Sequence, residues 1–214
     1  MARMTIITST IGQPELPRAI KLSALQTEYC RQLVVVDGMK FAEKAMKSLE
    51  GLPEKHYQVM VLPENTGSDA EGNVTHYGYR INAGIPHFVN TEFVCFLDYD
   101  NWYDPNFAER MIEAIGDKDV VTCRRKVWSS DMEYIGVDNF ESIGNELFDT
   151  NTLVFRTEAY CKHYCQAWAH GGWPGDRLMT KRILEMDNYV HIPDPMVNYV
   201  CPERLNEFFM KNCT

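Results

Sequence analysis

Residues 94–104 read Val-Cys-Phe-Leu-Asp-Tyr-Asp-Asn-Trp-Tyr-Asp, an apolar run of strand length that stops at two carboxylates, Asp98 and Asp100. A buried strand delivers acids in this way to its carboxyl end, where open α/β sheets bind ligands. Two acids at one strand exit repel each other unless a cation lies between them, and a hard divalent ion with oxygen ligands suits them. The alternative interpretation is an Asx-rich turn after a strand.

Length, composition and charge narrow the possibilities. The chain has 214 residues, of which 45% are hydrophobic, and this predicts one domain over residues 1–214 with a packed core. A formal net charge of −9 and a pI near 5.2 argue against a nonspecific nucleic-acid or anionic-membrane surface. Small molecules and neutral polymers fit this charge better.

The cysteines and the N-terminus indicate the compartment. Seven cysteines are odd in number and lack a Cys-x-x-Cys spacing, which argues against a disulfide framework and a structural zinc site. The N-terminal apolar stretch is too short for a signal peptide, and no run approaches the roughly 20 apolar residues of a membrane span. We therefore expect a soluble, cytoplasmic protein without a membrane span.

Apolar patterns alternate between strand and helix periods in the first half of the chain. Short turns separate the elements, which is typical of a parallel sheet covered on both faces. The carboxyl ends of such strands form one crevice, so Thr8, Asp37, Asn65 and Asp98 should converge. The expected strands are Met4–Thr8, Arg31–Val36, Tyr57–Leu62 and Glu92–Leu97, and the expected helices are Leu16–Gln26, Phe41–Leu49 and Thr75–Phe88.

The second half is less regular. The segment 127–145 is rich in Trp, Ser, Asp and Asn and shows no clear period. Around it we expect a helix from Pro105 to Ile115, strands at Val120–Cys123 and Thr152–Arg156, and a helix at Glu158–Trp168.

Five motifs in this order carry a family resemblance: Thr8-Ser9-Thr10, Val34-Val35-Val36-Asp37-Gly38, Asn82-Ala83-Gly84-Ile85, Phe96-Leu97-Asp98-Tyr99-Asp100-Asn101 and Gly175-Asp176-Arg177. Across roughly Met4 to Tyr199 the chain resembles a glycosyltransferase of the GT-A fold, most similar to the inverting family-2-type enzymes. The resemblance implies a Rossmann-like α/β sandwich with a central, mostly parallel sheet flanked by helices. Residues 1–104 would bind the nucleotide-sugar and residues 105–214 the acceptor.

The resemblance also assigns donor-site residues. Thr8, Ser9, Thr10 and Asp37 would line the nucleotide pocket, with Asp37 accepting from the uracil edge of a UDP-sugar. The Asp-x-Asp residues would hold Mn²⁺ or Mg²⁺ against the diphosphate, with Asp100 as the direct ligand and Asp98 nearer the ribose. The other donor-site candidates are Asn65, Arg80, Asn82, Gly84 and Tyr99.

Physical chemistry supports these roles separately. The leaving group departs as a diphosphate, so a cation that neutralises its developing charge lowers the barrier. Gly84 would permit close packing under the donor site, and Arg80 has a guanidinium that can reach a phosphate. The family's Arg-Asn pair is here Arg80-Ile81-Asn82, with Ile81 in the place of the Arg. The alternative for Arg80 is a solvated helix residue.

Asp176 matches the base of the resembling family. An inverting transfer needs one base to deprotonate the acceptor hydroxyl. The family's acidic pair at the start of a helix has become Gly175-Asp176 in this chain. The alternative for Asp176 is to cap the helix Arg177–Leu184.

The acceptor side is less defined. Trp173 beside Gly172 suits a platform for a sugar ring or an aromatic acceptor, with core packing as its alternative, and we also expect Asn151 and Trp102 to contact the acceptor. The acceptor is a glycan or another hydroxyl compound. A modified DNA base is possible because Arg124-Arg125-Lys126 is a basic cluster near the expected cleft, but the acidic balance favours a glycan.

Histidine and cysteine give weaker signals. No His lies near Asn198–Glu203, where the resembling family often carries one, and His191 is expected to be a strand residue. Cys161, His163 and Cys165 share a helical spacing that is more typical of a core than of a metal site.

The main hypothesis is a metal-dependent glycosyltransferase that moves a sugar from a nucleotide donor, with UDP favoured, to a hydroxyl acceptor. One alternative is a sugar nucleotidyltransferase, but residues 9–14 lack the basic phosphate loop that such enzymes carry. The other is a degenerate GT-A domain that binds sugars or acts as a scaffold. The presence of Asp98, Asp100 and Asp176 argues against it.

Overall fold

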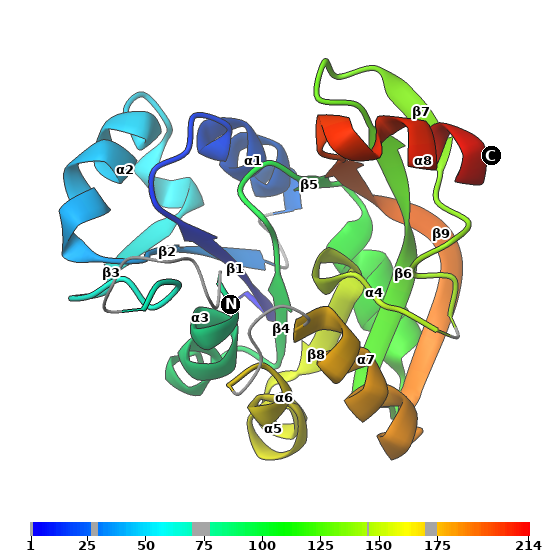
Figure 1. Ribbon diagram of the computed structural model, residues 1–214. Coiled ribbons are helices and arrows are strands. Elements are labelled where there is room, and N and C mark those ends of the chain that lie inside the picture. Colours follow the sequence, from blue (N-terminus) through cyan, green and yellow to red (C-terminus); the bar gives the residue numbers. More distant parts are fainter. Residues whose placement is uncertain (1, 27–29, 70–77, 145, 170–174) are drawn as a thin grey trace.

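The computed structural model describes residues 2–26, 30–69, 78–144, 146–169 and 175–214. Nine strands form one sheet between helices (Figure 1). They are β1 (Met4–Thr10), β2 (Cys30–Val36), β3 (Gln58–Val61), β4 (Phe93–Phe96), β5 (Trp102–Tyr103), β6 (Val120–Trp128), β7 (Tyr134–Val137), β8 (Leu153–Arg156) and β9 (Tyr189–Val200).

The helices follow the same alternation along the chain. They are α1 (Leu16–Ser23), α2 (Ala42–Leu49), α3 (Tyr79–Gly84), α4 (Phe107–Ile115), α5 (Thr157–Ala159), α6 (Gln166–Ala169), α7 (Gly175–Met186) and α8 (Asn206–Asn212). Short 3₁₀ turns lie at Ala24–Gln26, Met39–Phe41, Glu54–His56, Ile85–Phe88, Thr150–Thr152 and Glu203–Leu205, and a π-helical turn lies at Tyr160–Tyr164.

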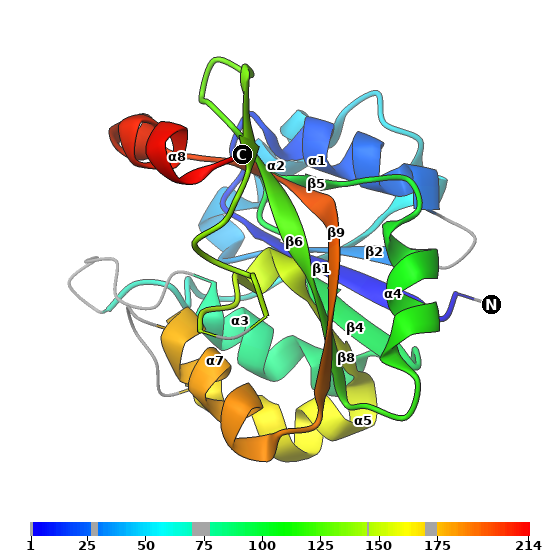
Figure 2. The ribbon, with the colours of Figure 1, turned by 90° about the vertical axis from the view of Figure 1, so that its right-hand side faces the viewer.

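The sheet is mostly parallel, as predicted. Its order is β3-β2-β1-β4-β8-β6-β9-β5, with β7 paired to β6. Parallel pairing joins β1 to β2 and β4, β2 to β3, and β6 to β9, which run side by side in Figure 2. Among the described strands only β5, β7 and β8 run against the rest. The predicted α/β class is confirmed.

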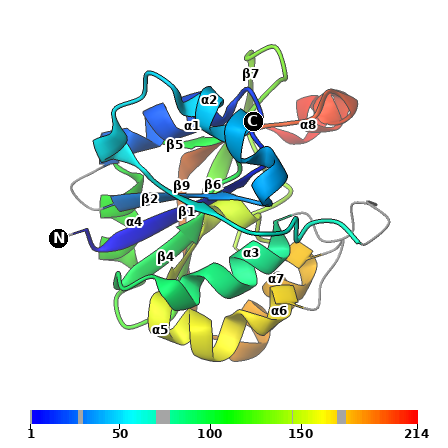
Figure 3. The same ribbon diagram turned by 90° about the vertical axis from the view of Figure 1, so that its left-hand side faces the viewer.

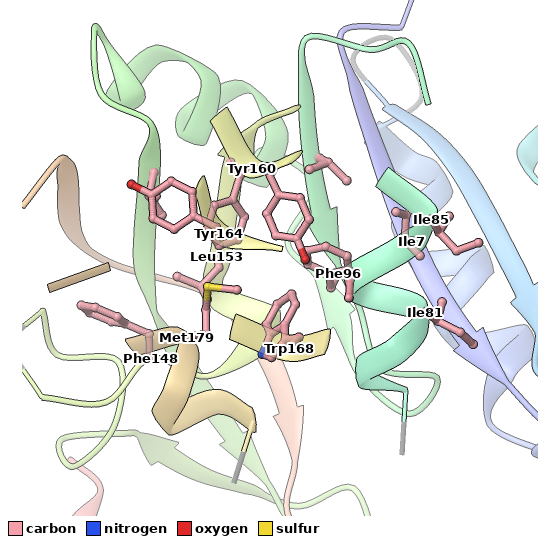
Figure 4. Packing of buried hydrophobic residues seen from close by; sticks show 14 of the residues in the cluster. Ile7, Ile81, Ile85, Phe96, Phe148, Leu153, Tyr160, Tyr164, Trp168 and Met179 are labelled. Atoms are coloured by element: carbon pink, nitrogen blue, oxygen red, sulfur yellow. The ribbon is translucent and has the colours of Figure 1, made fainter. Parts of the chain in front are cut away.

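Helices cover both faces of the sheet, because successive strand residues point to opposite sides. Met4 and Ile6 of β1 pack with Phe107 and Met111 of α4, while Ile7 packs on the opposite face. Figure 3 shows α1 and α2 on one side of the sheet and α3, α5, α6 and α7 on the other. The core under the second group is aromatic and includes Phe96, Tyr160, Tyr164 and Trp168 (Figure 4).

The structure differs from the predicted elements mainly after residue 100. β6 continues to Trp128 instead of ending at Cys123, and β5 and β7 were not predicted. The charged run Arg124-Arg125-Lys126 hides the strand pattern, since charges are rare in buried strands. The helix predicted at Glu158–Trp168 contains the π-helical turn. The helix predicted from Thr75 begins at Tyr79 within the described part, and residues 70–77 lie outside it.

No helix among the described residues is long and apolar enough to cross a membrane. All seven cysteines are free in the described structure.

Candidate active site

Asp37 lies at the exit of β2 and is held by the loop that follows β3. Its carboxylate accepts hydrogen bonds from the Asn65 side chain (3.0 Å) and from the backbone amides of Thr66 (2.7 Å) and Gly67 (3.1 Å). The structure therefore brings the predicted residues Asp37 and Asn65 into contact. A pocket of about 290 Å³ opens at the same edge, lined by Gly38, Met39, Lys40, Pro63, Glu64, Asn65, Ser68 and Asp69.

Several buried polar atoms of β1 and of the loop after β3 lack hydrogen-bond partners among the described residues. Within the described part of the chain, Asn65 Oδ1, Thr66 Oγ1 and Thr8 Oγ1 accept and donate no hydrogen bond. Buried polar groups are usually bonded, so these three atoms are suited to contact a ligand. Thr10 has a local role instead, because its hydroxyl donates to Gln13 (2.6 Å) in the turn after β1.

The start of α3 lies against β1. A Cβ atom built on Gly78 would come within 2.4 Å of the Ser9 hydroxyl, which places Ser9 beside the head of this helix. Arg80 donates to the carbonyl of Thr66 (3.3 Å), in the loop that holds Asp37. Asn82 is buried, and its carbonyl accepts from Tyr160 (2.7 Å).

The reason predicted for Gly84 is wrong. A Cβ atom at this position would meet no described atom within 4 Å, so close packing does not require a glycine there. Its backbone is ordinary right-handed helix, with φ −96° and ψ −43°.

Asp98 follows β4 and is fixed by Asn151 from the turn before β8. The Asn151 amide donates to the Asp98 carboxylate (2.8 Å), and its oxygen accepts from the Asp98 backbone amide (2.7 Å). The Asp98 side chain is exposed at the mouth of the site, yet the surrounding protein limits its hydration. This desolvation raises the pKa of Asp98, and the charges of Asp100 and Asp149 raise it further.

Asp100 is partly buried beside Asp98. Desolvation is the main cause that raises the pKa of Asp100 to about 6. Arg18 of α1 donates to the Asp100 carbonyl (2.8 Å) and lies 5.3 Å from the centre of the Trp102 ring. Tyr99 is partly buried against the apolar cluster that includes Leu16 and Ile20 of α1, and burial raises its pKa to about 12.

Asp176 is the second residue of α7, and its carboxylate accepts a hydrogen bond from the Thr150 hydroxyl. Desolvation and the negative charge of Asp149 raise the pKa of Asp176 to about 8, and the Thr150 bond opposes this change. Asp98 raises it as well. The Asp176 carboxylate thus contacts Thr150, in the turn before β8. The alternative interpretation, in which Asp176 only caps its own helix, did not predict this contact.

Tyr79 packs under the head of α7. A Cβ atom at Gly175 would lie 2.7 Å from its ring, so only glycine fits there. Burial raises the pKa of Tyr79 above its ordinary range, as do the charges of Asp176 and Asp98. The Tyr79 hydroxyl therefore stays neutral.

The predicted acceptor residues have different surroundings. Asn151 is 0% exposed, so its location does not suit contact with an acceptor. The ring centres of Trp102 and Trp128 lie 5.5 Å apart, and those of Trp128 and Tyr134 lie 5.3 Å apart; both contacts are tilted. Gly172 and Trp173 lie outside the described residues.

A groove of about 690 Å³ runs along α7 from the residue after Asp176. It is lined by Phe140, Glu141, Glu146, Leu147, Arg177, Thr180, Lys181, Leu184 and Glu185. Both walls of this groove belong to residues 105–214, the half of the chain that the resemblance assigned to the acceptor.

The basic cluster does not form a cationic surface. Arg125 is 1% exposed and pairs with Asp138, Glu141 and Asp149. Lys126 pairs with Asp104 (2.6 Å). Arg124 donates to the Asp138 carbonyl (2.9 Å). Acidic or carbonyl oxygens therefore engage all three cations.

The remaining His and Cys candidates do not form a metal centre. In the described part of the chain, no group of three or more His, Cys, Asp or Glu side chains is arranged to hold a metal ion. His191 lies in β9, as predicted, with its ring against Gly144. Cys161 and Cys165 border the aromatic core.

Asp98 and Asp100 nevertheless fit a divalent cation that has further ligands from a bound diphosphate and water. Desolvation raises the pKa of both acids by more than Arg125 and Arg18 lower it, so a bound cation would stabilise their ionised forms. Carboxylate oxygens are the ligands that Mn²⁺ and Mg²⁺ prefer.

The mostly parallel sheet, with acids at two strand exits and a third acid at the head of α7, agrees with the GT-A fold that the sequence resembles. The sequence matches the family described as glycosyl transferase family 2 over residues 5–185. This match spans most of the chain, and the chain belongs to glycosyl transferase family 2. Comparison with curated protein sequences gave no match.

Solved glycosyltransferase structures share this fold. The chain is similar to residues 1–349 of S. aureus TarS in complex with UDP-GlcNAc, with a TM-score of 0.62 and 15% identity over 95% of this chain and 59% of that one. It is also similar to the mannosyltransferase PcManGT from Pyrobaculum calidifontis in complex with GDP-Man and Mn²⁺, with a TM-score of 0.62 and 15% identity over 94% of this chain and 58% of that one. In both cases the chain spans less than two thirds of the other protein.

Sequence reasoning missed five residues of the site: Arg18, Tyr79, Arg125, Asp149 and Thr150. Arg125 was noticed only as part of a basic cluster. The available signal was weak: the charged run 124–126 lies between apolar residues, and a charge that is buried there needs acidic partners.

Proposed function

We propose that this protein is a metal-dependent, inverting glycosyltransferase that moves a sugar from a nucleotide-sugar donor, with UDP favoured, to a hydroxyl acceptor. One observation carries the proposal. Asp98 at a strand exit and Asp176 at a helix head both bond to one turn, through Asn151 and Thr150. The two acids come from different elements but are held by the same turn. This arrangement suits a site in which Asp98 serves the donor and Asp176 serves the acceptor.

On the donor side, Asp37 and the unpartnered oxygens of Asn65 and Thr8 would bind the nucleoside. The Asp37 carboxylate can accept a hydrogen bond from the N–H of uracil, and equally from the N–H groups of guanine. Arg80 and Ser9 lie near enough to the same loop and strand exit to contact the phosphates or ribose. The two similar proteins were solved with UDP-GlcNAc and with GDP-Man, and calorimetry with both nucleotides measures which nucleobase this site prefers.

Asp98 and Asp100 would hold Mn²⁺ or Mg²⁺, which neutralises the charge that develops on the diphosphate. Arg18 fixes the Asp100 carbonyl, and Asn151 fixes the Asp98 side chain and backbone. These contacts set the acids in place before a donor binds.

Asp176 would remove the acceptor proton. A base works best when its pKa lies near the operating pH, and desolvation brings Asp176 into that range. Thr150 donates to one carboxylate oxygen, and the other can face the acceptor hydroxyl.

The acceptor would bind beside α7. We propose a glycan or another hydroxyl compound, approached through the groove along α7 or over Trp102, with Trp173 and Gly172 as further candidates. A modified DNA base is less well supported, because acids and carbonyls engage the basic cluster.

We propose that residues 1–214 act as one GT-A domain, with residues 1–104 on the donor side and residues 105–214 on the acceptor side. One sheet that continues through both halves supports a single domain. Seven free cysteines support a cytoplasmic location.

Calorimetry tests the donor site. UDP and UDP-sugars should bind with Mn²⁺, and EDTA should weaken binding. Asp100→Ala should abolish the metal-dependent part, while Asp117→Ala, an exposed acid in the turn after α4, should not. Failure of every nucleotide to bind, or normal Mn²⁺-dependent binding by Asp100→Ala, would contradict the proposal.

Turnover tests the base. Asp176→Asn should keep nucleotide binding and lower the rate by roughly 10²-fold to 10⁴-fold. Hydrolysis of a donor sugar without acceptor excludes a degenerate sugar-binding module. Formation of UDP-sugar from UTP and a sugar phosphate would instead favour a nucleotidyltransferase.

A further inference from the structure

A short turn between the two candidate acids connects them to a buried arginine. The turn consists of Asp149, Thr150 and Asn151, which we call the 149–151 turn. Asp149 caps it, because its carboxylate accepts from the Asn151 backbone amide (2.8 Å). Each of its three side chains bonds to a different charged residue, namely Arg125, Asp176 and Asp98.

Asn151 has little freedom to rotate. Its amide nitrogen donates to both Asp98 (2.8 Å) and Asp149 (2.8 Å), and its oxygen accepts from the Asp98 backbone (2.7 Å). Both amide hydrogens and the oxygen are therefore used, and the side chain is 0% exposed. Rotation of the amide would break all three bonds.

Arg125 anchors the other end of the turn. Its guanidinium donates to Asp138 (2.8 Å), Glu141 and Asp149, so each of its nitrogens has an acidic partner. The Tyr199 ring lies 4.1 Å from the guanidinium carbon. A planar cation held by three carboxylates and an aromatic face has one orientation.

We propose that Arg125 and the 149–151 turn are positioning residues that fix the Asp98 and Asp176 carboxylates relative to each other. This inference rests on the proposed function for its rate predictions. Thr150 and Asn151 are adjacent, so movement of the turn displaces both acids together. A donor bound at Asp98 and an acceptor held at Asp176 are then aligned by one rigid support.

The two contacts predict different defects. Loss of the Asn151 contact should loosen Asp98 and weaken metal-dependent nucleotide binding. Loss of the Thr150 contact should leave nucleotide binding intact and lower turnover. A turn that only stabilises the fold would change neither selectively.

Thr150→Val tests the Asp176 contact, because valine keeps the shape and removes the hydroxyl. Thr150→Ser restores the hydroxyl. Thr5→Val is a matched control, since Thr5 is fully buried in β1 and its hydroxyl bonds to the Thr91 hydroxyl (2.7 Å). We expect Thr150→Val to lower kcat of donor hydrolysis or transfer by about 10- to 100-fold, with the Kd for UDP and Mn²⁺ within about twofold. Thr150→Ser should recover most of the rate.

Asn151→Ala tests the Asp98 contact. The Kd for UDP in Mn²⁺ should rise by about 10- to 100-fold, while the Kd in EDTA stays unchanged. Arg125→Lys keeps the charge but loses the planar fork, and it should weaken both binding and turnover. Should Arg125→Lys fail to fold, the Thr150 and Asn151 variants still decide the question.

A readout independent of activity separates this inference from the proposed function. Carboxyl ¹³C titration of Asp176 in the metal-free protein should give a higher pKa in Thr150→Val than in the wild type. Thr150→Ser and Thr5→Val should give the wild-type pKa. Wild type that neither binds nucleotides nor hydrolyses donors would overturn the proposed function, and the titration would still test the Thr150 contact. The inference is overturned if Thr150→Val leaves this pKa unchanged, or if, in an active wild type, Thr150→Val and Asn151→Ala lower only the melting temperature.

Discussion

Replacing Asp176 by Asn should stabilise the metal-free protein at neutral and higher pH. The folded state holds a proton on this acid more tightly than the unfolded chain does, because desolvation and the charge of Asp149 raise the pKa of Asp176 from 3.8 to about 8. The contribution of Asp176 to stability is therefore complete below pH 3.8 and is lost as the pH rises towards 8. Asparagine is uncharged throughout and avoids that loss.

The size of the effect follows from the same values. Each tenfold difference in proton affinity is worth about 1.4 kcal/mol, which sets an upper limit of about 4 kcal/mol at pH 7. Water at the partly buried carboxyl and the positive end of the α7 dipole both favour the charged form. We therefore expect a net gain of about 1–3 kcal/mol, or about 3–10 °C in Tm for a protein of this size.

Thermal unfolding followed by circular dichroism in EDTA measures this gain. The difference in Tm between Asp176→Asn and wild type should be largest near about pH 8 and should vanish near about pH 4. Asp117→Asn, on the exposed turn after α4, is the control and should show no comparable trend. A lower Tm for Asp176→Asn at about pH 8, or an equal shift at both pH values, would refute the reasoning.

Three further outcomes are expected. Gly175→Ala should lower stability by about 1–3 kcal/mol and reduce turnover, because its Cβ would lie 2.7 Å from the Tyr79 ring; thermal melts and donor hydrolysis measure both. Gly84→Ala should raise stability by about 0.5–1 kcal/mol in the same melts, since the backbone is helical and the space is open. Arg18→Met should weaken UDP binding about tenfold by calorimetry in Mn²⁺ and leave binding in EDTA unchanged, because it releases the Asp100 carbonyl.

The first half of the fold was predictable because each strand carries its own signal. Cys30–Val36 is apolar through most of its length and ends at Asp37, and both faces of the strand are buried. Short turns between such runs leave few alternatives to a parallel sheet. The second half lacks this property, since β6 includes Arg124, Arg125 and Lys126, whose partners lie in other segments.

The same contrast holds for the site. Asp98 and Asp100 could be identified because the strand before them fixes where they emerge. The role of Arg125 could not, because its acidic partners follow it by 13, 16 and 24 residues with no period. Asn151 was expected to contact the acceptor, but only the packed structure shows that it is fully buried against Asp98.

The glycine at position 175 also has a physical explanation. The resembling family carries a second acid there, whereas here the Tyr79 ring occupies the space that any side chain at Gly175 would need. A second carboxylate would add to the charges of Asp149 and Asp98, which already raise the pKa of Asp176. A further rise in this pKa would leave less of the proposed base ionised at neutral pH. The uncharged Tyr79 ring occupies this space without that electrostatic cost, so Gly175 and Tyr79 together add no negative charge beside the proposed base.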